Sequence, residues 1–152
     1  MKKIRLYDEA YRSGHAFSIT IATRMRRPYF AGPEAAPIAL QALRESAESH
    51  DAAVFAYCFM PNHAHLLAAT PSERALNLSG PFWQTRYFDH ALRQEESLET
   101  VASYIWENPV RAGLVAEARD HRYSGSLAFP DAFSSGAEAP DLLLLRRERR
   151  PT

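Results

Sequence analysis

The sequence predicts an α+β fold in which helices cover one face of an antiparallel sheet. Its 152 residues suit a single domain with a core of its own, and its hydrophobic share of 46% and charged share of 24% are ordinary for a globular protein. The predicted elements follow in the order strand, helix, strand, strand, short connection, strand and helix. The middle two strands are separated only by a tight turn, which makes them a β-hairpin. This order and this hairpin together favour the α+β class.

The first strand and the first helix are predicted from the pattern of apolar residues. Residues 15–22 (HAFSITIA) alternate apolar and polar side chains, as a half-buried strand does. A basic turn over residues 24–28 (RMRRP) ends this strand. Pro33 and Pro37 open the helix, which continues to about Glu48 with apolar residues along one side.

The hairpin is predicted over residues 54–70 (VFAYCFMPNHAHLLAAT), where Pro61 and Asn62 join two apolar runs. Proline fixes φ at the first central position of such a turn, and asparagine tolerates the second. Residues two apart on a strand share a face, so His63 and His65 project together. Two adjacent imidazoles can hold a divalent metal ion, but a histidine in an apolar strand is more often a hydrogen-bonded structural residue. The pair alone therefore leaves both interpretations open.

The chain after the hairpin contains a short connection, a strand and a tail. Residues 70–82 form the connection, whose Gly-Pro pair stops any helical turn. Residues 83–92 (WQTRYFDHAL) predict the fourth strand. Residues 1–128 make up the predicted domain, and the Pro/Gly/Ala-rich and basic tail of residues 129–152 is predicted to be flexible.

The second helix is predicted over residues 95–108 (EESLETVASYIWEN), with glutamates at its start, where the helix dipole favours negative charge, and Pro109 at its end. Tyr104 and Asn108 are four residues apart and are therefore neighbours on a polar edge, which Arg111 continues. A tyrosine beside a packing stripe is usually a half-buried core residue with its hydroxyl at the surface. The helix alone does not assign a reaction to Tyr104.

Charge and cysteine content bear on the possible binding partners of the protein and on its cellular compartment. The formal net charge is zero, so total charge gives no argument for nucleic-acid binding. Basic residues crowd the first thirty and last ten positions, which suits either a phosphate-binding surface or solvated ends. The one cysteine, Cys58, lies in an apolar strand and is expected to be a buried structural side chain, so no disulfide framework exists and the reducing cytoplasm is the expected compartment. The charged first residues lack the apolar stretch typical of a signal peptide, so none is expected, and no apolar run approaches transmembrane length.

Three strings in a fixed order carry a family resemblance: MPNHAHLL at 60–67, FWQTRYFDH at 82–90 and SYIWENPVRAGLV at 103–115. With them, the chain resembles the REP-associated tyrosine transposases of the wider single-strand (HUH) transposase family from about Tyr11 to about Ser126. The combination of MPNH-x-H with YI-x-x-NPVRAGLV is highly specific. The resemblance implies a ferredoxin-like or palm-like sheet, with metal-binding histidines on a central strand and a nucleophilic tyrosine on a late helix.

The resemblance also implies a role for each matching residue. Tyr104 falls at the position of the nucleophile, His63 and His65 at the metal-binding pair, and Asn108 at the polar residue that completes the metal site. The implied reaction is a metal-dependent nicking and strand transfer on single-stranded hairpin DNA, such as a REP element, through a 5′-phosphotyrosine intermediate. Imidazole and amide ligands suit Mn²⁺, whereas Mg²⁺ prefers oxygen, and either ion is expected. The expected DNA contacts are four arginines: Arg24, Arg26, Arg27 and Arg111.

One departure from the family pattern keeps other functions open. Members of the family usually have a full basic helix between the histidine strand and the Trp-Gln strand, whereas only residues 70–82 are available here. A shortened helix would weaken the hold on DNA and expose part of the sheet. The alternatives are a degenerate, non-catalytic module that binds DNA hairpins, or a self-associating domain without DNA affinity. The protein is expected to be a monomer or a homodimer and to make no contact with a membrane.

Overall fold

The computed structural model describes residues 16–69, 83, 88–91 and 98–130. Their strands are β1 (Ala16–Ala22), β2 (Ala53–Met60), β3 (His63–Ala69), β4 (Phe88–Ala91) and β5 (Ser124–Gly125). Their α-helices are α2 (Ala35–Ser49), α3 (Leu98–Trp106) and α4 (Asn108–Arg111), and their 3₁₀ turns are η1 (Arg24–Arg26), η2 (Tyr29–Ala31) and η3 (Ala118–Asp120). Among these residues no helix combines the length and the apolar character needed to cross a membrane.

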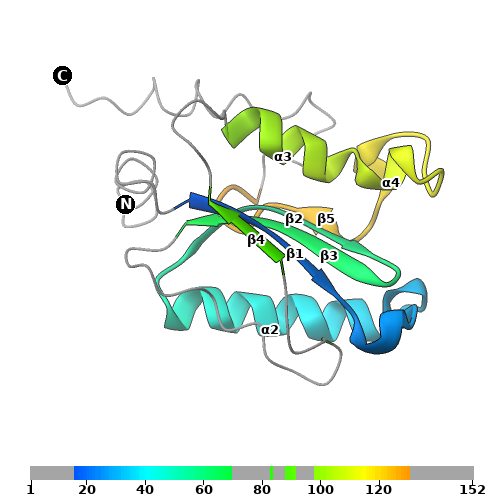
Figure 1. The fold of residues 1–152 in the computed structure, drawn as a ribbon, viewed down its shortest axis with the longest axis horizontal. Helices are drawn as coiled ribbons and strands as arrows, with labels where there is room; N and C mark the ends of the chain where they lie inside the picture. The colour runs from blue at the N-terminus through cyan, green and yellow to red at the C-terminus, as the bar shows by residue number, and fades with distance from the viewer. Residues whose placement is uncertain (1–15, 70–82, 84–87, 92–97, 131–152) are drawn as a thin grey trace.

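The strands form one sheet in the order β4-β1-β3-β2-β5, and each neighbouring pair is antiparallel (Figure 1). β3 lies between β1 and β2, so α2 connects two strands that are parallel to each other and not adjacent. The hairpin forms as predicted, because Met60 pairs with His63 across the turn made by Pro61 and Asn62. The predicted α+β class with an antiparallel sheet is confirmed.

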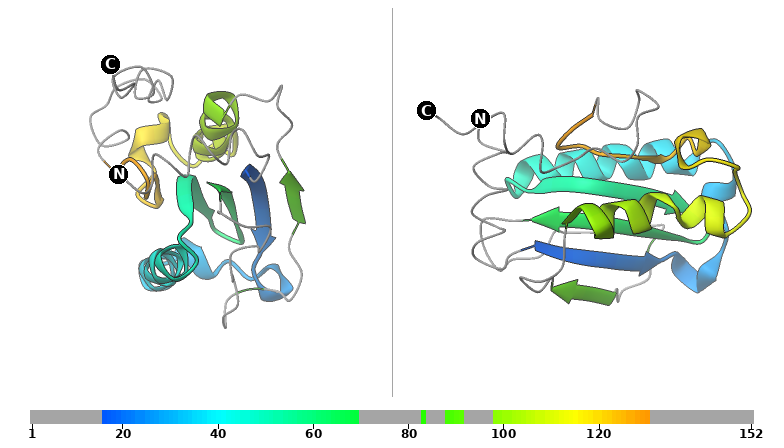
Figure 2. Two further views of the ribbon diagram at one scale, coloured as in Figure 1. Left: turned by 90° about the vertical axis from the view of Figure 1, so that its left-hand side faces the viewer. Right: turned by 90° about the horizontal axis from the view of Figure 1, so that it is seen from above.

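The prediction that helices cover only one face of the sheet is wrong. α2 covers one face, while α3 and α4 cover the other (Figures 1 and 2). The reason lies in β2 (AVFAYCFM), which is buried at every position and so carries apolar side chains on both faces. Phe55, Cys58 and Met60 join the core under α3, whereas Val54 and Phe59 join the core over α2. Since both faces are apolar, both require a covering layer.

The structure tests one of two further predicted boundaries in part and contradicts the other. Of the strand predicted over residues 83–92, the described part contains β4 (Phe88–Ala91) and Trp83, which makes an isolated bridge to Thr23, while residues 84–87 and 92 lie outside the described residues. Pro109 does not end the helical path, because α4 begins one residue before it, at Asn108. Proline is well tolerated in the first turn of a helix, where its missing N–H would have no intrahelical partner. The chain therefore turns at Glu107 and continues as a second short helix.

The remaining predictions on chain organisation concern segments that lie largely outside the described residues. These segments are the short connection at 70–82 and the tail beyond Pro130. The predicted boundary after residue 128 precedes Phe129, whose ring stacks on Phe55 with centroids 6.3 Å apart. Phe129 thus packs against the core of the domain.

Candidate metal and nucleophile site

The histidine pair lies on the face of the sheet that α3 covers. His63, His65 and Leu67 alternate along β3 and therefore share a face. Leu67 is fully buried in the core that includes α3, whereas Ala64 and Leu66 belong to the core on the α2 side. The two imidazoles consequently point toward α3, with ring centroids 4.9 Å apart. The prediction that they project together is confirmed.

Each imidazole already has a partner for its Nδ1 atom. His63 Nδ1 lies 2.7 Å from Oδ1 of Asn62, and His65 Nδ1 lies 3.1 Å from Oγ1 of Thr20. An amide oxygen only accepts hydrogen bonds, so Nδ1 of His63 carries the proton and Nε2 of the neutral ring keeps its lone pair. Metal-binding histidines commonly have their second nitrogen oriented in this way by an outer group.

The electrostatic surroundings favour the neutral form of both rings. Burial and the charge of Arg26 lower the pKa of His63. Burial, then the charges of His63 and Arg111, lower the pKa of His65 to about 4. Since the neutral imidazole is the form that binds metal, both rings suit that role at neutral pH.

Tyr104 lies on the flank of α3 that faces away from β5. On the opposite flank, the indole N–H of Trp106 donates a hydrogen bond to the carbonyl oxygen of Gly125 in β5 at 3.0 Å. Successive residues in an α-helix are separated by about 100°, so Tyr104 lies roughly 200° around the helix from Trp106. Its side chain is 62% exposed.

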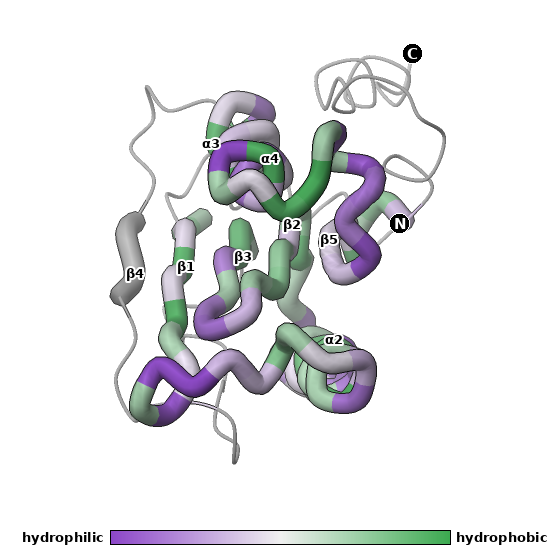
Figure 3. Tube along the Cα trace, turned by 90° about the vertical axis from the view of Figure 1, so that its right-hand side faces the viewer, coloured by the Kyte–Doolittle hydropathy of each residue, from purple (hydrophilic) through white to green (hydrophobic). Residues whose placement is uncertain are grey.

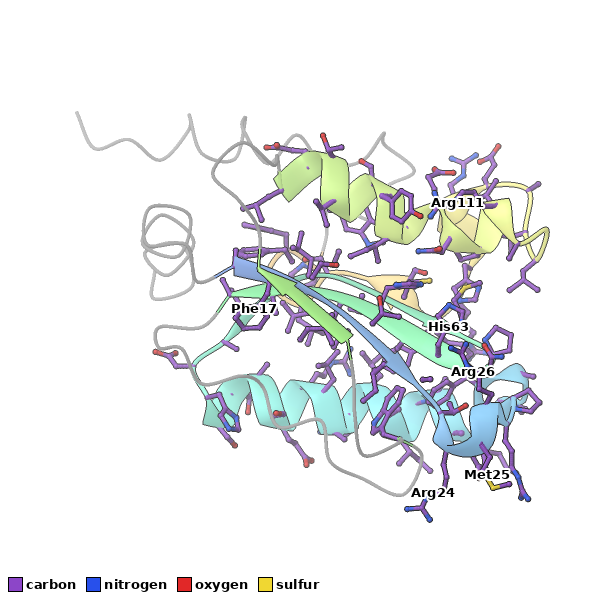
Figure 4. All side chains as sticks on the ribbon, in the orientation of Figure 1. Phe17, Arg24, Met25, Arg26, His63 and Arg111 are labelled. Atoms are coloured by element: carbon purple, nitrogen blue, oxygen red, sulfur yellow. The ribbon has the colours of Figure 1, made fainter. Side chains whose placement is uncertain are left out.

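Arg111 contacts Tyr104 and acts electrostatically on His65. Its Cζ atom lies 3.9 Å from the centroid of the Tyr104 ring, and its Nη2 donates to the Tyr104 carbonyl oxygen at 2.6 Å. The same guanidinium charge contributes to the lowered pKa of His65. Figure 4 shows Arg111 on α4 at the same end of the molecule as His63. One side chain of α4 thus links the exposed tyrosine to the histidine face of the sheet.

Asn108 is half-buried at the start of α4, where the amide nitrogen is held by the helix backbone. Its Nδ2 donates to the carbonyl oxygens of Ile105 at 3.2 Å and Tyr104 at 3.4 Å. Oδ1, the other end of the amide, is therefore turned away from these carbonyls. Among the described residues, no group of three His, Cys, Asp or Glu side chains lies close enough to hold a metal ion. The role of Asn108 as a third donor for the pair, which the family resemblance implies, stays a prediction.

The other three arginines predicted to contact DNA lie on the opposite side of the His63–His65 pair from Arg111. Arg24, Arg26 and Arg27 are exposed in the loop that follows β1, and Ala22 at the end of β1 pairs with His63. Figure 3 looks onto this end of the molecule, with α4 above the β2–β3 turn and the hydrophilic loop below it. The four arginines therefore flank the histidines from two directions.

Sequence reasoning missed the residues that orient the histidines. The turn pattern predicts only a turn role for Asn62, although its place directly before His63 is a signal that it could orient this ring. Thr20 gave no signal, since its contact with His65 depends on the register between β1 and β3. Cys58 is buried as expected, and burial raises the pKa of its thiol to about 11, which makes it a poor nucleophile.

Two comparisons with known proteins bear on this arrangement. A curated protein of Haemophilus influenzae named as a REP-associated tyrosine transposase is 26% identical over 112 residues, covering 55% of this chain and 64% of that protein. A solved REP-associated tyrosine transposase, bound to a REP hairpin, superposes with a TM-score of 0.66 at 20% identity over 84% of each chain. The resemblance to the REP-associated tyrosine transposases is confirmed.

The likeness to the solved transposase establishes the fold, and the match to the curated transposase spans less than two thirds of that protein's length. No protein-family model matches the chain.

Proposed function

We propose that this protein nicks and transfers single-stranded, hairpin-forming DNA, with Tyr104 as the nucleophile and a divalent metal ion as cofactor. The observation that carries the proposal is that Arg111, which stacks on the exposed Tyr104 ring, also acts electrostatically on His65, one of two adjacent imidazoles on the face of the sheet toward α3. The curated relative named as a REP-associated tyrosine transposase and the solved one bound to a REP hairpin support the substrate class.

The residues present fit a divalent ion of the Mn²⁺ or Mg²⁺ type. His63 and His65 would offer Nε2, since their Nδ1 atoms are engaged, and Asn108 would offer Oδ1. Two nitrogen ligands and one oxygen ligand suit Mn²⁺ better than Mg²⁺. When bound, the ion would act as a Lewis acid that neutralises negative charge on the scissile phosphate.

The protein's own residues account for the covalent step. The phenol oxygen of Tyr104 forms a bond to phosphorus and loses its proton to solvent, while the bond from phosphorus to the 3′ oxygen breaks and leaves a 3′-OH. The resulting phosphotyrosine ester retains the energy of the broken bond, so a second 3′-OH can reverse the step without an external energy source. Arg111 stacks on the ring and hydrogen-bonds the Tyr104 carbonyl, which holds the nucleophile in one orientation.

Covalent capture of the DNA tests the proposal. The protein is incubated with a single-stranded REP-type hairpin and Mn²⁺, and protein–DNA conjugates are separated on a denaturing gel. Tyr104→Phe removes one oxygen atom, so conjugates should disappear while hairpin binding persists. Tyr123→Phe is the matched control, because that ring also has an arginine near its face, Arg122, with Cζ 5.9 Å from the ring centroid. Conjugates from Tyr104→Phe at the wild-type level would refute the assignment.

A second candidate is a module that binds DNA hairpins without cutting them. It is favoured by the lack, among the described residues, of a third His, Cys, Asp or Glu beside the pair, which makes the metal site depend on an amide. This alternative predicts a retarded hairpin on a native gel and no conjugate at any Mn²⁺ concentration.

A further inference from the structure

Thr23 places a buried hydroxyl directly after β1. The buried residues of that strand are alanines and isoleucines only, and Thr23 is itself fully buried. Its hydroxyl donates to the carbonyl oxygens of Arg27 at 2.7 Å and Asn62 at 3.0 Å. One buried hydroxyl thus joins the loop after β1 to the turn between β2 and β3.

This hydroxyl is not needed to satisfy the two carbonyls. The backbone N–H of Thr23 donates to the Asn62 carbonyl oxygen at 3.0 Å, and the backbone N–H of Tyr29 donates to the Arg27 carbonyl oxygen at 2.8 Å. A valine, which has nearly the same shape as threonine, would therefore leave neither carbonyl without a donor. What the hydroxyl adds is a fixed distance between two segments that lie 39 residues apart in the sequence.

Asn62 carries this constraint to the histidine pair. Its backbone carbonyl accepts from Thr23, while its side-chain Oδ1 accepts from Nδ1 of His63 at 2.7 Å. The bond to Oδ1 also fixes the tautomer of His63, because a proton on Nδ1 leaves the lone pair of Nε2 free for a metal ion. The path from Thr23 to His63 therefore consists of two hydrogen bonds through one residue.

The turn is held from the far end of the loop as well. The backbone N–H of Phe30 donates to the carbonyl oxygen of Pro61 at 3.0 Å. Both central residues of the turn thus accept a hydrogen bond from the segment that follows β1. Figure 4 shows Arg26, in this segment, at the same end of the molecule as His63. The loop backbone and the turn that precedes His63 form one hydrogen-bonded unit.

We propose that Thr23 is a positioning residue of the metal site, which orients His63 by fixing the backbone of Asn62. This inference rests on the proposed function, since it assigns a metal ion to the His63–His65 pair. It adds a residue that is neither a metal ligand nor a direct partner of either imidazole. The alternative is a purely structural hydroxyl, which would stabilise the fold without any effect on the histidines.

The tautomer of His63 in the metal-free protein separates these two roles. Long-range proton–nitrogen NMR spectra show which imidazole nitrogen carries the proton. We expect a protonated Nδ1 of His63 in the wild type and in Thr23→Ser, which keeps the hydroxyl. Thr23→Val and Thr23→Ala both lack it and should show a mixture of the two tautomers.

Ser126→Ala is the matched control for loss of a buried hydroxyl. Ser126 is buried and donates to the carbonyl oxygen of Val54 at 3.4 Å, near the end of β2 that lies away from the turn. This variant should melt at a lower temperature than the wild type and leave the tautomer of His63 unchanged.

Mn²⁺ binding, measured by isothermal titration, gives a second readout. Thr23→Val should weaken binding about tenfold or more, as loss of an outer-shell group does, whereas Thr23→Ser and Ser126→Ala should stay close to the wild type. A double-mutant cycle with Asn62→Ala then tests the path. If Thr23 acts through Asn62, Thr23→Val should have no further effect on Mn²⁺ affinity once Asn62 is an alanine.

Three results distinguish failure of the inference from failure of the proposed function. If Thr23→Val melts at a lower temperature but keeps the wild-type tautomer and Mn²⁺ affinity, the hydroxyl is purely structural and the inference fails. If the effects of Thr23→Val and Asn62→Ala add fully in the double mutant, Thr23 does not act through Asn62, and the inference fails again. If the wild type binds no Mn²⁺, the proposed metal site fails; a changed tautomer in Thr23→Val would then still uphold the orienting role, and an unchanged one would overturn it.

Discussion

Thr20 and Asn62 give the two histidines different kinds of partner. Asn62 presents an amide oxygen to His63, which fixes the tautomer of that ring, whereas Thr20 presents a hydroxyl that can either donate to His65 or accept from it. The orientation of His65 therefore depends on a β1 residue that takes no part in the proposed chemistry. Thr20 is in this sense a positioning residue.

Thr20→Val tests that role with a side chain of nearly the same shape. Without the hydroxyl, Nδ1 of His65 loses its partner, and the affinity for Mn²⁺ should fall about 10- to 100-fold, as it does when outer-shell groups are removed from metal sites. Isothermal titration with Mn²⁺ measures the change. Ser18→Ala, two residues earlier on the same face of β1, serves as the control, and equal Mn²⁺ affinity in the wild type and Thr20→Val would contradict the role.

The lowered pKa of His65 predicts how the metal-free protein responds to acid. The folded state holds this ring neutral down to about pH 4, whereas the unfolded chain protonates it near pH 6.5. Between these values the unfolded state binds more protons, so the free energy of unfolding should fall as the pH is lowered from about 6.5 to about 4. Melting temperatures measured without metal should show this fall in the wild type and a shallower one in His65→Gln. Parallel curves for the two proteins would argue against it.

At the scale of secondary-structure elements, the break between α3 and α4 brings Arg111 next to Tyr104. Pro109 starts a new helix after Glu107 instead of ending the helical path, so Arg111 returns to donate to the carbonyl of Tyr104. Helical periodicity predicts that Tyr104, Asn108 and Arg111 lie along one edge, which agrees with the contacts among them, whereas the prediction that Pro109 ends the helix is wrong. Periodicity identifies the residues on an edge, whereas the direction of the chain after a proline depends on packing.

Arg111→Gln tests the contribution of this helix pair. Loss of the stacked guanidinium should leave Tyr104 poorly oriented, and conjugate formation should slow roughly 10- to 100-fold, because small misplacements of a reacting group are costly. Mn²⁺ affinity should stay close to that of the wild type, which distinguishes a positioning effect from loss of the metal site. Arg119→Gln is the control, since Arg119 pairs with Glu117 on the surface. An equal effect of both substitutions would indicate a general loss of positive charge.

At the scale of the whole molecule, the sequence predicted the parts more reliably than their arrangement. The hairpin and the shared face of His63 and His65 followed from turn chemistry and period-two alternation. The second helical layer was missed, although the unbroken apolar run of β2 was a signal that both faces of the sheet are covered. The register that joins Thr20 to His65 was not accessible, since nothing local in the sequence specifies which residues of β1 and β3 are opposite each other.

The distribution of charge is also a property of the whole molecule. A net charge of zero conceals arginines gathered at one end of the sheet, in the loop after β1 and on α4. A phosphate chain that binds there would pass between Arg111 and the loop that carries Arg24, Arg26 and Arg27. The histidine pair and Tyr104 lie in the same region, so the charge and the proposed chemistry coincide.

Identification of the residue that becomes linked to DNA tests the central claim most directly. The conjugate formed with a REP-type hairpin and Mn²⁺ is digested with nuclease and protease, and the modified peptide is sequenced by mass spectrometry. We predict a nucleotide joined through its 5′-phosphate to Tyr104. Attachment to any other residue, or cleavage of the DNA with no modified peptide, would contradict the account.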